Sequence, residues 1–178
     1  MATFSDHFSS TASASSVEVG YRPGPKQNFS TETIRAEFLL PTTAGGAPIT
    51  DDDTIMFTLH TSDRLHSINL SADALIAATA LNIDVGTHLA GDNHDGGEVD
   101  EDFFSSTVDL DSTGPVRADS MFESGTVQPS ESGDYVWEIL NLASDTDTYY
   151  DVVIHWNLVT AITVGGKVVL EAEVSRPG

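Results

Sequence analysis

The stretch Thr54-Ile55-Met56-Phe57-Thr58-Leu59-His60 is the clearest structural signal in this chain. Ile55, Phe57 and Leu59 occupy every second position, so they point to the same side of an extended backbone. A period of two is typical of a β-strand that buries one face and exposes the other. Residues 54–60 are therefore predicted to form a half-buried strand.

Seven further stretches alternate in the same way, and turn-rich loops separate them. They span residues 33–40, 65–70, 79–85, 107–110, 135–140, 151–159 and 167–174. Many short strands with few helical segments favour an all-β fold, namely an antiparallel β-sandwich or a jelly roll. A chain of 178 residues has the usual size of one domain, so we expect this sandwich to be a single domain over residues 31–178.

Turn residues predict how some of these strands connect. Thr61-Ser62-Asp63 predicts a hairpin between the first quoted strand and the next one, and Gly165-Gly166 predicts a turn between the last two strands. Asp102-Phe103-Phe104 is predicted to open a helical turn. Residues 72–80 are compatible with a short helix or with a strand that begins near Thr79, and the polar residues 111–134 are predicted to run over the surface.

The first 30 residues differ from the rest and predict an extended N-terminal arm outside the compact core. Their centre is rich in Ser, Ala and Thr, and Arg22-Pro23-Gly24-Pro25-Lys26 follows. Each proline disfavours helix at the residue before it, so this segment must be extended or turning. Arg22, Pro23 and Lys26 are candidate contacts to a neighbouring subunit, where the two bases would pair with carboxylates. The alternative is a free terminus with two solvated bases.

The charge balance is strongly acidic. Seven Lys and Arg face 28 Asp and Glu, which gives a formal net charge of −21. Such a surface repels phosphate backbones and anionic lipid, so neither nucleic acid nor a membrane is an expected partner. The simplest role of the excess carboxylate is solubility; the alternatives are a basic partner or divalent cations.

An acidic Gly-rich loop over residues 91–102 is a candidate Ca²⁺ site, because Ca²⁺ prefers clustered oxygen ligands. Its candidate ligands are Asp92, Asn93, Asp95 and Asp102. The loop departs from the EF-hand pattern, because Gly91 stands at the first ligand position and Asp102 at the position of the bidentate Glu. A solvated acidic loop is therefore the preferred interpretation, and no cofactor is expected.

Catalytic and zinc-binding motifs are missing from the sequence. The six histidines do not fall in zinc-ligand spacings, and no G-x-S-x-G elbow, P-loop or dinucleotide fingerprint occurs. We expect a protein that is not an enzyme. Trp137 and Trp156 lie on alternating stretches and are expected to be core anchors, whereas an exposed pair would indicate sugar binding.

Signals for secretion are also missing. Residues 1–6 have neither a basic segment nor an apolar one, and no apolar run approaches the ~20 residues that cross a bilayer. The chain contains no cysteine, so disulfides and thiolate chemistry are excluded. These features predict a soluble product made in the cytoplasm of the host cell.

Several stretches resemble a family of small virion proteins of tailed phages. They are Ser62-Asp63-Arg64-Leu65-His66-Ser67-Ile68, Leu81-Asn82-Ile83-Asp84-Val85-Gly86, Gly97-Glu98-Val99-Asp100-Glu101-Asp102-Phe103-Phe104, Tyr135-Val136-Trp137-Glu138, Tyr149-Tyr150-Asp151-Val152 and Tyr21-Arg22-Pro23-Gly24-Pro25. Many members of this family are encoded near the major capsid protein. The resemblance spans most of the chain and contains no catalytic signature, so it assigns no role to single residues.

The resemblance implies a capsid decoration or cement protein on the virion surface. Its partners would be the major capsid protein and copies of itself, and a trimer at a local threefold axis is one arrangement that the resemblance implies. The composition agrees with this role, because cement needs a rigid β core, an arm and no enzyme site. Two alternatives stay open: a tail- or fibre-associated adhesin domain that binds a host-surface glycan, and a Ca²⁺-dependent domain.

Overall fold

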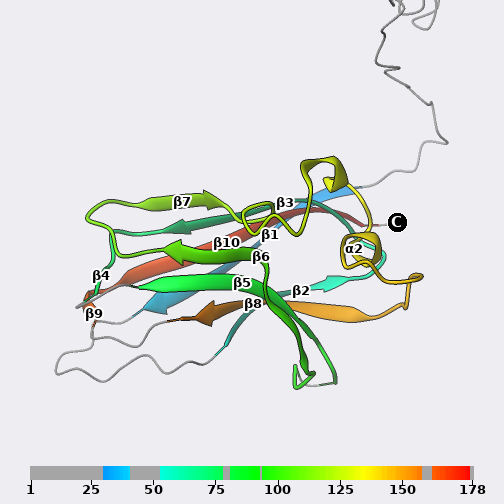
Figure 1. The fold of residues 1–178 in the computed structure, drawn as a ribbon, viewed down its shortest axis with the longest axis horizontal. Helices are drawn as coiled ribbons and strands as arrows, with labels where there is room; N and C mark the ends of the chain where they lie inside the picture. Colours follow the sequence, from blue (N-terminus) through cyan, green and yellow to red (C-terminus); the bar gives the residue numbers. More distant parts are fainter. Residues whose placement is uncertain (1–29, 41–52, 78–80, 93, 158–161, 177–178) are drawn as a thin grey trace, which may run out of the picture.

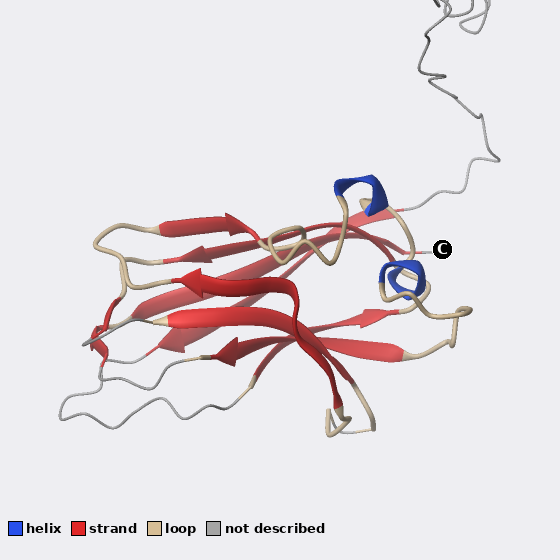
Figure 2. Ribbon diagram, in the orientation of Figure 1, coloured by secondary structure: helices blue, strands red, loops and turns tan. Residues whose placement is uncertain are grey.

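The strands of the described residues form two packed four-stranded antiparallel sheets and one small two-stranded sheet (Figure 1). The computed structural model describes residues 30–40, 53–77, 81–92, 94–157 and 162–176. The strands are β1 (Ser30–Leu40), β2 (Thr54–His60), β3 (Arg64–Ala72), β4 (Ile76–Ala77), β5 (Asn82–Leu89), β6 (Glu98–Asp109), β7 (Val116–Asp119), β8 (Tyr149–Trp156), β9 (Ile162–Val164) and β10 (Gly166–Arg176). A 3-10 turn η1 (Pro129–Glu131) and one helical turn α2 (Val136–Ile139) are the helical elements of the described residues (Figure 2).

The strand order is that of a jelly roll. One sheet has the order β1-β10-β3-β7 and the other has the order β2-β8-β5-β6. The first long strand pairs with the last, the second with the second-last, and so on inward: β1 with β10, β2 with β8, β3 with β7, and β5 with β6. A long antiparallel ladder rolled into two layers has this pattern. The prediction of an antiparallel β-sandwich, or jelly roll, is therefore confirmed.

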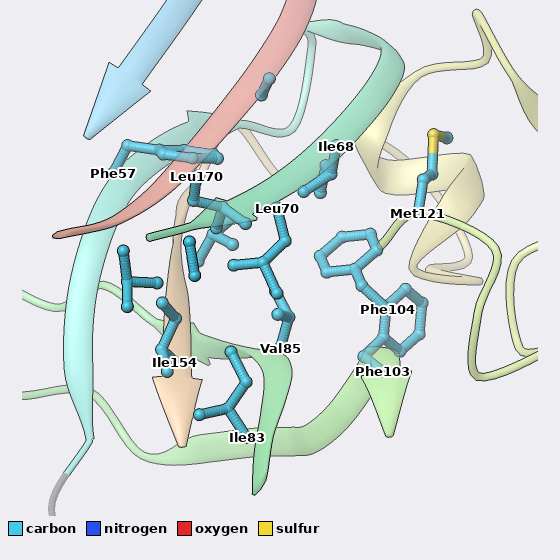
Figure 3. Packing of buried hydrophobic residues seen from close by; sticks show 14 of the residues in the cluster. Phe57, Ile68, Leu70, Ile83, Val85, Phe103, Phe104, Met121, Ile154 and Leu170 are labelled. Atoms are coloured by element: carbon cyan, nitrogen blue, oxygen red, sulfur yellow. The ribbon is translucent and has the colours of Figure 1, made fainter. Parts of the chain in front are cut away.

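The core lies between the two sheets. Alternate residues of facing strands supply it, among them Ile68, Leu70, Val85, Ile154 and Leu170 (Figure 3). All five are at most 1% exposed. Burying each of these side chains contributes about 1.5–3 kcal/mol, so this interlayer cluster is the main source of stability.

Two predicted connections are wrong, because consecutive strands here cross between layers. β2 and β3 lie in different sheets, so the turn at residues 61–63 is a corner of the sandwich and not a hairpin. β8 and β10 also lie in different sheets, and the short strand β9 between them pairs with β4. Among the main strands, β5 and β6 form a hairpin, and its end projects beyond the sandwich (Figure 1).

Two local predictions are also wrong. The alternating stretch at 135–140 forms the helical turn α2, which buries Val136 and Ile139 three positions apart and leaves Trp137 partly exposed. The predicted helical turn at residues 102–104 lies inside the continuous strand β6. Phe103 and Phe104 are both buried there, since the β5–β6 register shifts nearby and breaks the period of two.

The polar excursion at 111–134 is more ordered than expected. It contains β7 and η1, and Met121 and Val127 are buried in the core. In the ambiguous stretch 72–80, Ile76 and Ala77 form β4, whereas residues 78–80 lie outside the described residues.

Candidate interaction surfaces

The positive charge of the described residues is gathered on one of the two sheets. The ranges that the structure describes contain five Lys and Arg, and each lies on a strand of the β1-β10-β3-β7 sheet: Arg35, Arg64, Arg117, Lys167 and Arg176. The described strands of the other sheet carry none. The chain therefore has a mixed-charge sheet and an acidic sheet.

Ion pairs cross the outer face of the mixed-charge sheet at β1 and β10. Arg35 lies 2.6 Å from Glu37 and 3.4 Å from Glu171, and Lys167 lies 2.9 Å from Glu37. The hydrogen bond and the charge of Lys167, together with Arg35, hold the pKa of Glu37 below its ordinary value of 4.5. These side chains are 39–56% exposed, so the pairs contribute little to stability and order the surface instead.

A shallow depression of about 520 Å³ lies on the same outer face. Arg35 and Glu171 line one side of it, and Ser71, Arg117 and Asp119 line the other. Its walls are polar and carry both signs of charge. Such a surface suits a polar protein contact better than an apolar ligand.

The acidic sheet carries a network of histidines and carboxylates on its outer face. Asp53 lies 2.7 Å from His155 Nδ1 and 3.0 Å from His88 Nε2, although the His88 contact lacks hydrogen-bond geometry. Glu101 lies 3.7 Å from the other nitrogen of His155. Asp84 stands opposite His155 in the β5–β8 register. Residues from β5, β6 and β8, and from the segment just before β2, thus lie together around His155.

The surroundings of His155 favour its protonated form. Burial lowers the pKa of His155. The hydrogen bond and charge of Asp53, with the charges of Glu101 and Asp84, raise this pKa by more than burial lowers it. The net effect places the pKa of His155 above its ordinary value of 6.5. His155 therefore keeps its positive charge to a higher pH than a histidine in water does.

A second depression of about 520 Å³ lies where β2 and β8 meet the end of β10. Tyr149 is 57% exposed there, and its ring packs edge-on against His60 at 4.6 Å. Asp151 is 1% exposed; it accepts a hydrogen bond from Thr58 at 2.7 Å and lies 2.9 Å from His94 Nδ1. The buried carboxylate is satisfied by its neighbours, which is what a structural role requires.

The edges of the two sheets differ in how well they could pair with another strand. β7 has four residues, and the pairing of β2 and of β6 with their neighbours is interrupted by register shifts. β1 has 11 residues and pairs with β10 without interruption, from Ser30 opposite Arg176 to Leu40 opposite Gly166. Among the described residues, no strand other than β10 pairs with β1, so its second side is an open edge of the described sheet.

The candidate residues from the sequence are only partly placed. Arg22, Pro23, Lys26 and Asn93 lie outside the described residues. Asp92 and Asp95 are exposed in the turn after β5, and Asp102 is exposed within β6. The described ranges hold no group of three or more His, Asp or Glu suited to a metal ion.

The two tryptophans have different environments. Trp156 is 1% exposed, its indole donates a hydrogen bond to Thr54 at 2.8 Å, and its ring centroid lies 5.3 Å from that of Phe38. It is the core anchor that the sequence predicts. Trp137 is only partly buried, because α2 turns Val136 and Ile139 inward instead. The core prediction for Trp137 is therefore wrong.

Sequence reasoning missed the network around His155. Asp53 and His155 are 102 positions apart, so no local motif contains both. A partial signal exists, since His155 occupies a polar position of an alternating strand. Only the pairing of β8 with β2 and β5 shows which acids face it.

The fold is similar to chains from two phage capsids. A chain from the capsid asymmetric unit of cyanophage Pam1 matches with a TM-score of 0.51 and 12% identity, over 94% of this chain and 99% of that one. A chain from the capsid of Ralstonia phage GP4 matches with a TM-score of 0.51 and 14% identity, over 89% of this chain and 94% of that one. Both matched chains therefore consist of this fold and little else.

Comparison at the level of sequence adds nothing to this. No protein-family model and no curated protein matches the chain. The identities to the two phage chains are low, so what they share with this protein is the fold. Within the described residues, no helix has the length and apolar character needed to cross a membrane.

Proposed function

We propose that this chain is a noncatalytic structural protein of a tailed-phage particle, and that it decorates the head. The observation that carries the proposal is the near end-to-end match of this jelly roll to single chains in two phage capsids. In those capsids the fold stands as a whole chain and not as a fragment of a larger one. Its partners would be the major capsid protein and further copies of itself.

The surface supports a role in assembly. A decoration protein is present in many equivalent copies, so each contact can be modest while the shell as a whole gains from multivalency. The mixed-charge sheet offers polar contacts of both signs, and the acidic sheet would keep particles from adhering to one another. In this arrangement residues 1–30 form the arm, and Arg22, Pro23 and Lys26 touch the neighbouring subunit.

An adhesin that binds a glycan is the second candidate, because jelly rolls also occur in lectins. One observation favours it: the exposed ring of Tyr149 lines a depression together with His60 and Ser62. Trp156 is buried and Trp137 is only partly exposed, so the two tryptophans do not form the exposed pair that would indicate sugar binding. Decoration is therefore the function that the structure supports best.

Electron microscopy of virions that carry a labelled copy of the protein tests the proposal. We expect the label at regular positions over the head. A label confined to the tail or its fibres would support the adhesin, and an unlabelled virion would reject both candidates.

Deletion of residues 1–29 tests the arm separately. We expect a folded product, because β1 begins at Ser30, and loss of attachment to heads that bind the full chain. The double variant Arg22→Ala, Lys26→Ala should weaken attachment, whereas His7→Ala serves as the matched control in the same segment. Attachment of the deleted chain at full strength would reject the role of the arm while leaving decoration intact.

A further inference from the structure

The open edge of β1 is the best template for pairing in the described structure. An edge strand presents unpaired backbone N–H and C=O groups, and proteins protect such edges with bulges, short strands or charge. β2 and β6 carry register shifts, β7 is short, and β6 also exposes Glu101 and Asp102. β1 is long and regular; Arg35 and Glu37 carry opposite charges, and its third charged residue, Glu32, lies 3.2 Å from Arg176 of the neighbouring strand β10. It is the edge without an evident protection.

The two faces of β1 differ in character. Ile34, Ala36 and Phe38 are partly buried and pack against the core, whereas Arg35 and Glu37 are exposed on the outer face. A strand added at this edge must continue both faces. It must therefore present apolar residues on the core side and complementary charges on the outer side.

We infer that the partner is the β1 strand of a second copy of this chain, paired antiparallel about a twofold axis at Ala36. In this register, residues equally far from Ala36 in opposite directions along the strand face each other. Arg35 then faces Glu37 of the second copy, and Glu37 faces its Arg35. On the core side, Ile34 faces Phe38 of the second copy, and Ala36 faces its own counterpart.

Neighbouring registers are less favourable. Opposite residues of an antiparallel pair must point to the same face, so the twofold axis has to lie at a residue. An axis at Arg35 or at Glu37 would set that charge against itself, and like charges directly opposite each other are destabilising. Axes at Ile34 or Phe38 leave both charges without an opposite partner. Ala36 is the centre that satisfies both charges.

The existing ion pairs extend this pattern across the joined sheet. Arg35 already contacts Glu171 on one side, and Glu37 already contacts Lys167. After pairing, the charges would alternate in the order Glu171, Arg35, Glu37 of the second copy and Lys167 of the second copy. Because these side chains are partly exposed, they would fix the register, while the backbone hydrogen bonds and the apolar pairs would supply most of the affinity.

Sedimentation of charge variants of the full chain tests the inference, which does not depend on attachment to a capsid. The wild type should form dimers, and Arg35→Glu and Glu37→Arg should each dissociate about tenfold more readily, since each places two like-charge pairs in the interface. A mixture of the two single variants should form heterodimers. The double variant Arg35→Glu, Glu37→Arg should form homodimers again.

Three controls show whether the β1 edge itself is responsible for these changes in association. Glu173→Arg makes the same charge change as Glu37→Arg on the same outer face, but on the inner strand β10, and should leave dimerisation unchanged. Circular dichroism and thermal unfolding should show that every variant is folded. Deletion of residues 1–29 should also leave the dimer intact.

Four results would overturn the inference. The first is a wild type that stays monomeric at about 100 μM, a concentration well above the micromolar Kd of even a modest interface. The second is a wild-type trimer, as the family resemblance implies. The third and fourth are single variants that dimerise as the wild type does, and a mixture of the two single variants that fails to associate. Dimerisation that appears only after deletion of residues 1–29 would assign the β1 edge to the chain's own arm instead.

Discussion

At the scale of single residues, Gly86 illustrates how one position makes room for a neighbouring strand. A Cβ at this position would lie 2.3 Å from the backbone oxygens of Asp100 and Glu101. Both atoms belong to the backbone of β6, so they cannot turn aside as a flexible side chain could. The close approach of β6 to β5 therefore depends on a glycine here.

Gly86→Ala should destabilise the protein by about 1–3 kcal/mol, the usual cost of forcing extra volume into packed structure. The matched control is Gly97→Ala, because a Cβ at Gly97 meets nothing within 4 Å. Its free energy of unfolding should stay within about 0.5 kcal/mol of the wild type. Urea unfolding of both variants measures the difference, and equal stability would contradict the close packing of β6 on β5.

His155 provides a pH-dependent contribution to stability. Its pKa in the folded protein lies above the unfolded value of about 6.5, so the folded state binds the proton more tightly. The stabilisation is therefore fully present below about pH 6.5 and is lost as the pH rises through the folded pKa. The source is Asp53 foremost, with Glu101 and Asp84 behind it.

We expect the stability difference between wild type and His155→Gln to be largest in mild acid and to shrink above neutral pH. Urea unfolding over this pH range measures it, and the comparison cancels the titration of groups that both proteins share. Asp53→Asn should reduce the same pH dependence. A difference that grows with pH would mean that burial, which lowers the pKa, outweighs the carboxylates.

At the scale of elements, α2 shows how a short stretch can satisfy two periodicities. Tyr135, Trp137 and Ile139 alternate as in a strand, whereas Val136 and Ile139 are three apart as on a helix face. The backbone N–H of Tyr135 donates to Glu138 at 3.1 Å, which closes the first turn. The N–H groups of Val136 and Trp137 donate to the corner that connects β2 and β3. These tertiary hydrogen bonds decide in favour of the turn.

Ile139→Ala should cost about 2–5 kcal/mol in unfolding free energy, because Ile139 is 6% exposed in the core. Trp137→Ala should cost clearly less, although tryptophan is the larger residue, because Trp137 is only partly buried. Thermal unfolding of the two variants ranks them. The opposite ranking would indicate that residues 135–140 form the strand that their alternation suggests.

At the scale of the whole molecule, the net charge of −21 works against compactness. The described bases lie on one sheet, so the acidic sheet has few cations nearby to offset its carboxylates. Mutual repulsion on that side should destabilise the folded state at low ionic strength. Salt screens such repulsion, and at about 1 M the screening length falls to ~3 Å.

Addition of NaCl to about 1 M should therefore raise Tm, with roughly 2–4 °C for each kcal/mol gained in a chain of this size. Chloride is the appropriate salt, because sulfate stabilises proteins in general by exclusion from their surface. The double variant Asp92→Asn, Glu98→Gln removes two exposed charges from the end of the β5–β6 hairpin and should gain less from salt. A Tm that is independent of salt would contradict the repulsion.

The sequence alone was sufficient for the fold class and for most strand positions. Alternation at 33–40, 54–60 and 167–174 identifies β1, β2 and β10, because a sandwich strand has one buried face and one exposed face. The same pattern failed at β6, where a shifted register buries Phe103 and Phe104 in succession. An apolar residue at every second position reflects which side chains are buried, so this alternation disappears where the pairing of the sheet is irregular.

Tertiary structure decided which strands meet. In a jelly roll the partner of a strand is set by its distance from the middle of the chain, and β1 pairs with β10 across the full length of the domain. Local turn residues carry no information on such distant pairing, so the sequence determined the strands of this protein but not their neighbours. The gathering of bases on one sheet, the acids around His155 and the open edge of β1 all follow from those pairings, since each depends on which strand lies beside which.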